Sequence, residues 1–251
     1  METHLKTIFN FLYHYRRYNQ AVQRNYYSNF IRPGSSKTDN VLSLLYAIAN
    51  TQSRPNIDKL ADFFKFIADE LESLESFGKF VQKINSDAIH NYNSLFEGLN
   101  RQNGWGAKTS ALFTKCIYHI HSGTYGNDLK IWDDVPSTIN ESDVFYLPVD
   151  AVIVAIFTHL NSARSWNFSN VNKMLREHYK SVEIEIWDDL WFWGFITQKG
   201  TGTNRLFEWN ENKYWILQET NKDPNEIAEI KDRAFEFLNI ISVNELTKRA
   251  I

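Results

Sequence analysis

The chain has 251 residues, of which 43% are hydrophobic and 23% are charged. This composition is typical of a globular protein and excludes a wholly disordered chain. The 27 Lys and Arg residues against 30 Asp and Glu residues give a net charge of −3, which excludes a surface that is positive all over but not a local basic face. Cys116 is the single cysteine and permits no intrachain disulfide. We therefore expect a reducing intracellular compartment, either the cytoplasm, in association with a nucleoid, or the nucleus.

The hydrophobic segments of the chain are short. The longest uninterrupted apolar run, 151–157, is far shorter than the roughly 20 residues that a membrane-spanning helix needs. Residues 1–20 lack both the apolar core and the small-residue cleavage site of a signal peptide. The sequence therefore predicts no association with a membrane.

Helical periodicity dominates the chain, with little strand-like alternation. Residues 123–146 are polar and rich in turn formers, which indicates a long loop. Two short apolar runs around Asn210-Glu211-Asn212 predict a small β-hairpin near 205–217. The expected fold class is therefore mainly α with one small β element. The apolar spacing predicts one or two helices over 58–80 and single helices over 91–100, 107–121, 151–160, 169–179 and 223–238.

A short glycine-containing segment, Gly104-Trp105-Gly106-Ala107-Lys108, lies between two of the predicted helices. Two glycines around one residue favour a tight turn, because glycine tolerates backbone angles that other residues avoid. The helix that follows presents N–H groups and the positive end of its dipole to that turn. The backbone from Gly104 to Ala107 is therefore a candidate site for a nucleic-acid phosphate. A plain corner between two helices, without a ligand, is the alternative for this segment alone.

A second motif, Pro148-Val149-Asp150, directly precedes the apolar helix predicted over 151–160. Asp150 stands at the N-cap position, where its carboxylate can accept hydrogen bonds from backbone N–H groups. Capping alone is the ordinary role of an aspartate in this place. A carboxylate has two oxygens, however, so Asp150 can cap the helix and also serve a second group.

Taken in order, the Gly-x-Gly-x-Lys motif of 104–108 and Pro148-Val149-Asp150 resemble the helix-hairpin-helix DNA glycosylase superfamily, which has a hairpin and a Gly/Pro-rich loop followed by an aspartate. The lysine makes the chain most similar to the 8-oxoguanine DNA glycosylases that also cleave abasic sites. The resemblance covers 91–160, the expected core with the hairpin and the aspartate. It implies that residues 1–251 form one unit of two helical lobes, with 123–146 as an inserted loop.

The resemblance also implies a chemistry. The protein would be a bifunctional DNA glycosylase and AP lyase that excises a damaged base, an oxidised purine such as 8-oxoguanine. Lys108 is the expected nucleophile, which attacks C1′ and forms a Schiff base that permits β-elimination. Asp150 is the expected partner that stabilises positive charge on the sugar and helps to deprotonate Lys108. The helix dipole and partial burial would both favour the neutral amine.

A damaged base must leave the duplex stack to reach such a site. Relatives bind the base partly with a polar residue and an aromatic residue four positions later on a late helix. This spacing predicts Asp189 with Trp193, and Asp188 with Phe192 shares it. Leu112 stands one turn after Lys108, where relatives carry a cysteine or phenylalanine that packs on the flipped base. The resemblance therefore implies that Leu112 is also a base-binding residue, and the identity of the base stays open.

The remaining expectations concern ions, partners and other classes of function. Relatives hold a monovalent cation on hairpin carbonyls, here those of Gln102 and Trp105, and no other cofactor is expected. The expected partner is DNA that contains a damaged base, bound by a monomer. Basic stretches at 1–33 and 161–181 are compatible with a nucleic-acid face. The alternatives are a non-catalytic helix-hairpin-helix module that only binds DNA, and a protein-interaction scaffold with aromatic residues around 187–215 as its interface.

Overall fold

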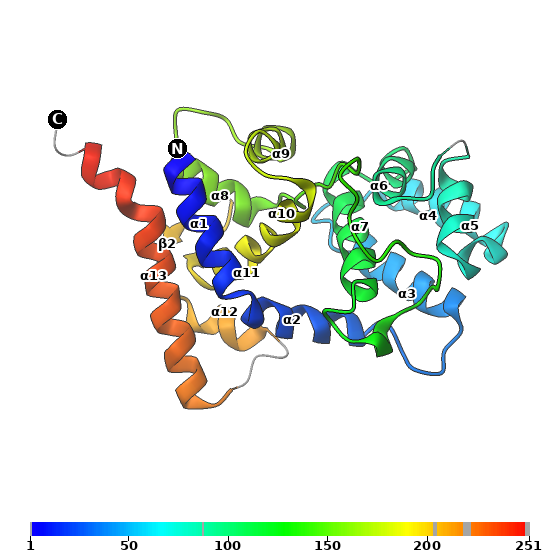
Figure 1. Cartoon of the computed structure of the whole chain (residues 1–251), viewed down its shortest axis with the longest axis horizontal. Coiled ribbons are helices and arrows are strands. Elements are labelled where there is room, and N and C mark those ends of the chain that lie inside the picture. The colour runs from blue at the N-terminus through cyan, green and yellow to red at the C-terminus, as the bar shows by residue number, and fades with distance from the viewer. Residues whose placement is uncertain (1, 87, 203–204, 218–221, 249–251) are drawn as a thin grey trace. The chain divides into compact units, whose positions relative to one another are not determined.

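The computed structural model describes residues 2–86, 88–202, 205–217 and 222–248 and is mainly α-helical (Figure 1). The chain divides into two compact units. We call Arg24–Pro148 the central unit, and we call Met1–Gln23 together with Val149–Ile251 the terminal unit. In the described part of the chain, no helix is both long and apolar enough to cross a bilayer.

The central unit is built on its last long helix, α7 (Ala107–His121), which packs against α6 (Tyr92–Asn100) and α3 (Lys37–Ala49). The buried side of α7 includes Phe113 and Ile117, and burying such side chains contributes roughly 1.5–3 kcal/mol each. The other elements of the unit are α4 (Ile57–Ala68), η1 (Leu71–Glu75), α5 (Phe77–Ile84), η2 (Asn127–Leu129) and the end of α2 (Arg16–Ser28).

Residues 123–146 contain only the short helix η2 among regular elements, yet their backbone is fixed to the rest of the central unit. The indole N–H of Trp132 donates to the carbonyl of Leu74 at 2.7 Å. The carboxylate of Asp134 accepts the backbone N–H groups of Phe77 and Gly78 at 2.9 and 2.8 Å, which stabilises the start of α5. The predicted long loop therefore packs as an ordered part of the unit.

The terminal unit holds α8 (Ala151–Leu160) against α11 (Asp189–Ile196) and α13 (Pro224–Lys248). Figure 1 shows α1 (Glu2–His14, blue) running beside α13 (red), and the two helices are in contact. The other elements of this unit are the start of α2, α9 (Phe168–Arg176), α10 (Ser181–Ile186), β1 (Gln198–Lys199), β2 (Leu206–Phe207) and α12 (Glu211–Ile216).

A glycine sets the distance between α8 and α11. A Cβ atom at Gly194 of α11 would lie 2.6 Å from Cδ1 of Ile156 and 2.8 Å from Cγ1 of Val152, both on α8. The absent side chain therefore permits an approach that any other residue would prevent. The side chain of Gln198 also donates to the carbonyl of Val152 at 3.0 Å. These contacts fix the face of α11 that meets the start of α8.

The structure contains a small β-hairpin, but only one of its two strands lies in the predicted range of 205–217. Leu206–Phe207 pairs in antiparallel fashion with Gln198–Lys199, and Glu211–Ile216 is the helix α12. Asn210 explains the difference, because its side chain accepts the N–H of Lys213 at 3.2 Å and caps that helix. The asparagine that indicates a turn therefore starts a helix.

The longer helices agree better with the sequence. The predictions over 107–121 and 151–160 are confirmed by α7 and α8. The helix predicted over 91–100 begins at Tyr92, because Asn91 is its N-cap and accepts the N–H of Ser94. The remaining predictions correspond to α4, η1 and α5, to the shorter α9, and to the longer α13.

Candidate functional site

The turn between α6 and α7 is a close-packed corner. Gly104 has a φ of 79°, and a Cβ atom there would lie 2.8 Å from the backbone nitrogen of Leu60. Both the positive φ and the close approach therefore require glycine. The buried ring of Trp105 packs against Phe63 and Phe113 at centroid distances of 5.2 and 5.9 Å, which anchors the corner in the core.

The side of this turn at the start of α7 is open. Gly106 is the N-cap of α7, is exposed, and would bring a Cβ atom within 4 Å of no other group. It has no side chain with which to cap the first turn, so a ligand can approach these N–H groups. The N–H of Trp105, in contrast, donates to the carbonyl of Gln102 at 3.2 Å. Among the predicted phosphate donors, the geometry thus favours Gly106 and Ala107 over Trp105.

The hairpin carbonyls predicted to hold a monovalent cation are those of Gln102 and Trp105. The Gln102 oxygen already accepts the N–H of Trp105, and the nearby Gly104 oxygen accepts the side chain of Gln52 at 3.1 Å. A carbonyl oxygen has two lone pairs, so Gln102 still has one for a cation. The monovalent cation on these carbonyls stays a prediction.

Lys108 is the second residue of α7, and its side chain is half-buried. Leu112, also half-buried, lies four residues later on the same side of the helix. A lysine this near the start of the helix lies close to the exposed N–H groups of the first turn.

Asp150 is the N-cap of α8, as predicted. Its Oδ1 accepts the N–H groups of Val152 and Ile153 at 2.9 and 3.1 Å. Its other oxygen, Oδ2, accepts the indole N–H of Trp191 at 3.2 Å. One oxygen therefore does all the capping, and the half-buried carboxylate directs the other toward the surroundings of α11.

Two residues near Asp150 in the terminal unit, Trp191 and Lys213, were not predicted from the sequence as part of the site. Trp191 stacks on Phe195 with a centroid distance of 5.0 Å and an interplanar angle of 12°. Nζ of Lys213 lies 5.0 Å from the centre of the Phe195 ring. Burial, together with the charge of Arg205, lowers the pKa of Lys213, while the charge of Asp150 acts in the opposite direction. The four-residue spacing of Trp191 and Phe195 was the signal available in the sequence.

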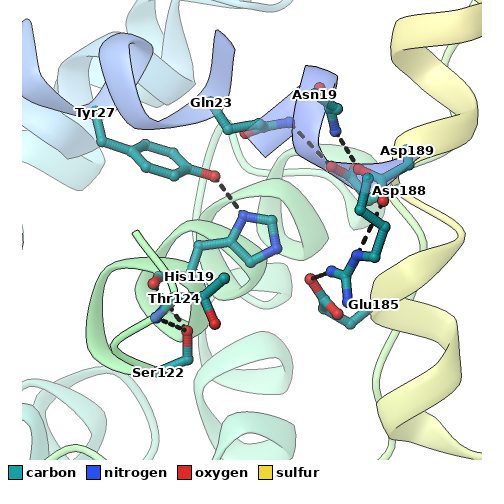
Figure 2. A network of polar contacts seen from close by, with 10 residues as sticks. Asn19, Gln23, Tyr27, His119, Ser122, Thr124, Glu185, Asp188 and Asp189 are labelled. Carbon is teal, nitrogen blue, oxygen red and sulfur yellow. Dashed lines mark hydrogen bonds and ion pairs between the residues drawn. The ribbon is translucent and has the colours of Figure 1, made fainter. Parts of the chain in front are cut away.

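The predicted base-binding pair, Asp189 and Trp193, lies inside the terminal unit. Both side chains are buried, with exposures of 2% and 0%. Asp189 accepts hydrogen bonds from Asn19 at 2.6 Å and from Arg16 at 3.2 Å (Figure 2). Burial raises the pKa of Asp189 well above its ordinary value, and Arg16 opposes that shift. These contacts join α2 to α11, and a role of the pair in binding a base stays a prediction.

The second pair with this spacing, Asp188 and Phe192, lies inside the same unit. Asp188 is buried and accepts a hydrogen bond from Gln23 at 3.0 Å, as Figure 2 shows. Phe192 is fully buried. The helical spacing was right, but this face of α11 is turned into the core of the terminal unit.

The histidines of α7 have structural partners. Nδ1 of His119 lies 2.7 Å from the hydroxyl of Tyr27 (Figure 2). Nδ1 of His121 lies 2.8 Å from the carbonyl of Ile117, and its Nε2 accepts the N–H groups of Ile131 and Trp132. Burial lowers the pKa of His121 to about 4, which keeps it neutral. Among the described residues, no three His, Cys, Asp or Glu side chains gather closely enough to hold a metal ion.

Both basic stretches carry exposed side chains. In 1–33, Arg16, Arg17 and Arg24 form ion pairs with acidic residues of their own units, and Lys6 and Arg32 are exposed. Around α9, Lys173 and Lys180 are exposed. Both stretches therefore stay candidates for a contact with nucleic acid.

The two motifs lie in different units, Lys108 in the central unit and Asp150 in the terminal unit. Their pairing at one sugar therefore stays a prediction. Comparisons with protein-family models, with curated proteins and with solved structures found no match to this chain.

Proposed function

We propose that the chain is a bifunctional DNA glycosylase and AP lyase of the helix-hairpin-helix type, acting on an oxidised purine such as 8-oxoguanine. The observation that carries the proposal is the start of α7, where an open glycine N-cap directly precedes Ala107 and the half-buried Lys108. A DNA phosphate on the N–H groups of this first turn would bring an adjoining sugar within reach of the lysine.

The proposed reaction uses the two motifs in turn. Asp150 stabilises positive charge on the sugar as the C1′–N bond breaks, and the base leaves with the bonding electron pair and takes up a proton. The free amine of Lys108 attacks C1′, and opening of the sugar ring gives a Schiff base. Loss of a proton from C2′ then expels the 3′ phosphate and nicks the strand. Hydrolysis of the imine returns the lysine.

Reductive trapping tests the proposal. Borohydride reduces the imine to a stable amine, so the wild-type protein should become covalently linked to a duplex with the correct damaged base. Lys108→Ala should abolish the adduct and leave DNA affinity largely intact. Lys79→Ala is the matched control, because Lys79 is an exposed lysine in the first turn of α5 in the same unit.

Two results would replace the proposal with the other classes of function. No adduct with any duplex in a panel of single modified bases and abasic sites would leave a module that only binds DNA. Affinity for DNA that does not fall between low and high salt would favour a protein-interaction scaffold, because phosphate contacts release counterions.

A further inference from the structure

The second oxygen of Asp150 has one hydrogen-bond donor from a distant part of the chain. Oδ1 is held by Val152 and Ile153 at the start of α8, whereas Oδ2 accepts the indole N–H of Trp191 on α11. The two residues are separated by 41 positions, so the contact depends on the packing of α11 against α8. The indole N–H of Trp191 therefore binds Oδ2, the oxygen that does not take part in capping.

The orientation of Trp191 is itself fixed by its neighbours. Its ring lies nearly parallel to that of Phe195, and Nζ of Lys213 lies over the Phe195 ring. Gly194, between the two aromatic residues, brings α11 against α8. The stack on Phe195 therefore fixes the indole ring, and the contact of α11 with α8 fixes the backbone of Trp191. Together these contacts orient the indole N–H toward Asp150.

We propose that Trp191 is a positioning residue for Asp150, whose indole N–H holds Oδ2 in the orientation that meets the sugar. This inference rests on the proposed function of Asp150. A carboxylate that is held in place before the reaction stabilises a developing positive charge without a reorganisation cost, and this saving lowers the free energy of the transition state. Trp191 need not touch the DNA for this role.

Trp191→Phe tests the inference, because it removes the N–H and retains an aromatic ring against Phe195. The single-turnover rate of base excision should fall by about tenfold, the equivalent of one hydrogen bond, with little change in the DNA concentration that gives half the maximal rate. The matched control is Trp215→Phe, which removes an exposed indole N–H that donates to Glu211 at 3.2 Å. The control should excise at the wild-type rate.

A spectroscopic measurement tests the contact without relying on activity. In a ¹H–¹⁵N spectrum of the wild-type chain, the indole resonance that disappears in Trp191→Phe should be the one that shifts most in Asp150→Asn. An unchanged Trp191 resonance in Asp150→Asn would overturn the inference. This comparison still decides if Trp191→Phe fails to fold, because sequential assignment of the wild-type spectrum identifies the Trp191 resonance without that variant.

The kinetic results separate the inference from the function on which it rests. If Asp150→Asn excises as fast as the wild type, the proposed role of Asp150 is wrong. If Asp150→Asn is inactive while a folded Trp191→Phe excises at the wild-type rate, only the role of Trp191 is wrong. Loss of activity in Trp191→Phe together with a large rise in the half-saturating DNA concentration would also overturn it, since that result indicates a binding role.

Discussion

Substitutions at Asp150 can separate its role as a helix cap from its proposed role as a catalytic charge. Asp150→Ala removes the cap, worth about 1 kcal/mol, and the hydrogen bond from Trp191, worth about 1 kcal/mol, so the free energy of unfolding should fall by about 2 kcal/mol. Asp150→Ser and Asp150→Asn retain a capping oxygen, so each should cost about 1 kcal/mol. All three lack the negative charge.

Urea unfolding followed by circular dichroism would measure the stabilities, and single-turnover kinetics on a damaged duplex would measure excision. If the charge at Asp150 stabilises the transition state, all three variants should excise about 100-fold more slowly or worse, whatever their stability. Near wild-type excision by Asp150→Ser or Asp150→Asn would show that the negative charge of Asp150 does not stabilise the transition state. A rate that followed stability, with the alanine variant alone inactive, would show that the residue acts only as a cap.

Two further predictions concern the central unit. Gly104→Ala should lower the free energy of unfolding by about 2–4 kcal/mol, because of the positive φ and the contact with Leu60, whereas Gly106→Ala should lower it by less than about 1 kcal/mol. Denaturant titration measures both variants, and equal losses would contradict the packing described for the turn. The pKa of His121 is depressed to about 4 in the folded state, so the unfolded state takes up the proton first as pH falls. Stability should therefore drop by about 2 kcal/mol between pH 7 and pH 5, and the drop should shrink in His121→Gln; an unchanged pH dependence in that variant would contradict it.

The elements that the sequence could predict are those with local signals. The start of α7 is marked by Gly106 and the start of α8 by Asp150, and both boundaries agree with the sequence. The second strand of the β-hairpin could not be predicted from local signals, because Asn210 is suited both to a turn and to a helix cap. Which of the two Asn210 forms depends on the pairing of Leu206–Phe207 with Gln198–Lys199, and that pairing is a tertiary contact.

The aromatic helix α11 shows the same limit at the candidate site. A spacing of four residues fits Asp189 with Trp193 and equally fits Trp191 with Phe195. Periodicity cannot decide which pair faces Asp150, because that depends on how α11 packs on α8 through Gly194. The structure buries the first pair, whereas Trp191 of the second pair donates a hydrogen bond to the aspartate and stacks on Phe195.

The residue that carries the trapped sugar shows most directly whether Lys108 is the nucleophile. The wild-type protein would be trapped with borohydride on a duplex that contains an oxidised purine, digested, and analysed by tandem mass spectrometry. We expect the reduced sugar remnant to be attached to Nζ of Lys108 and to be absent from every other lysine. Attachment to a different residue, or a nicked strand without any protein-linked sugar, would contradict it.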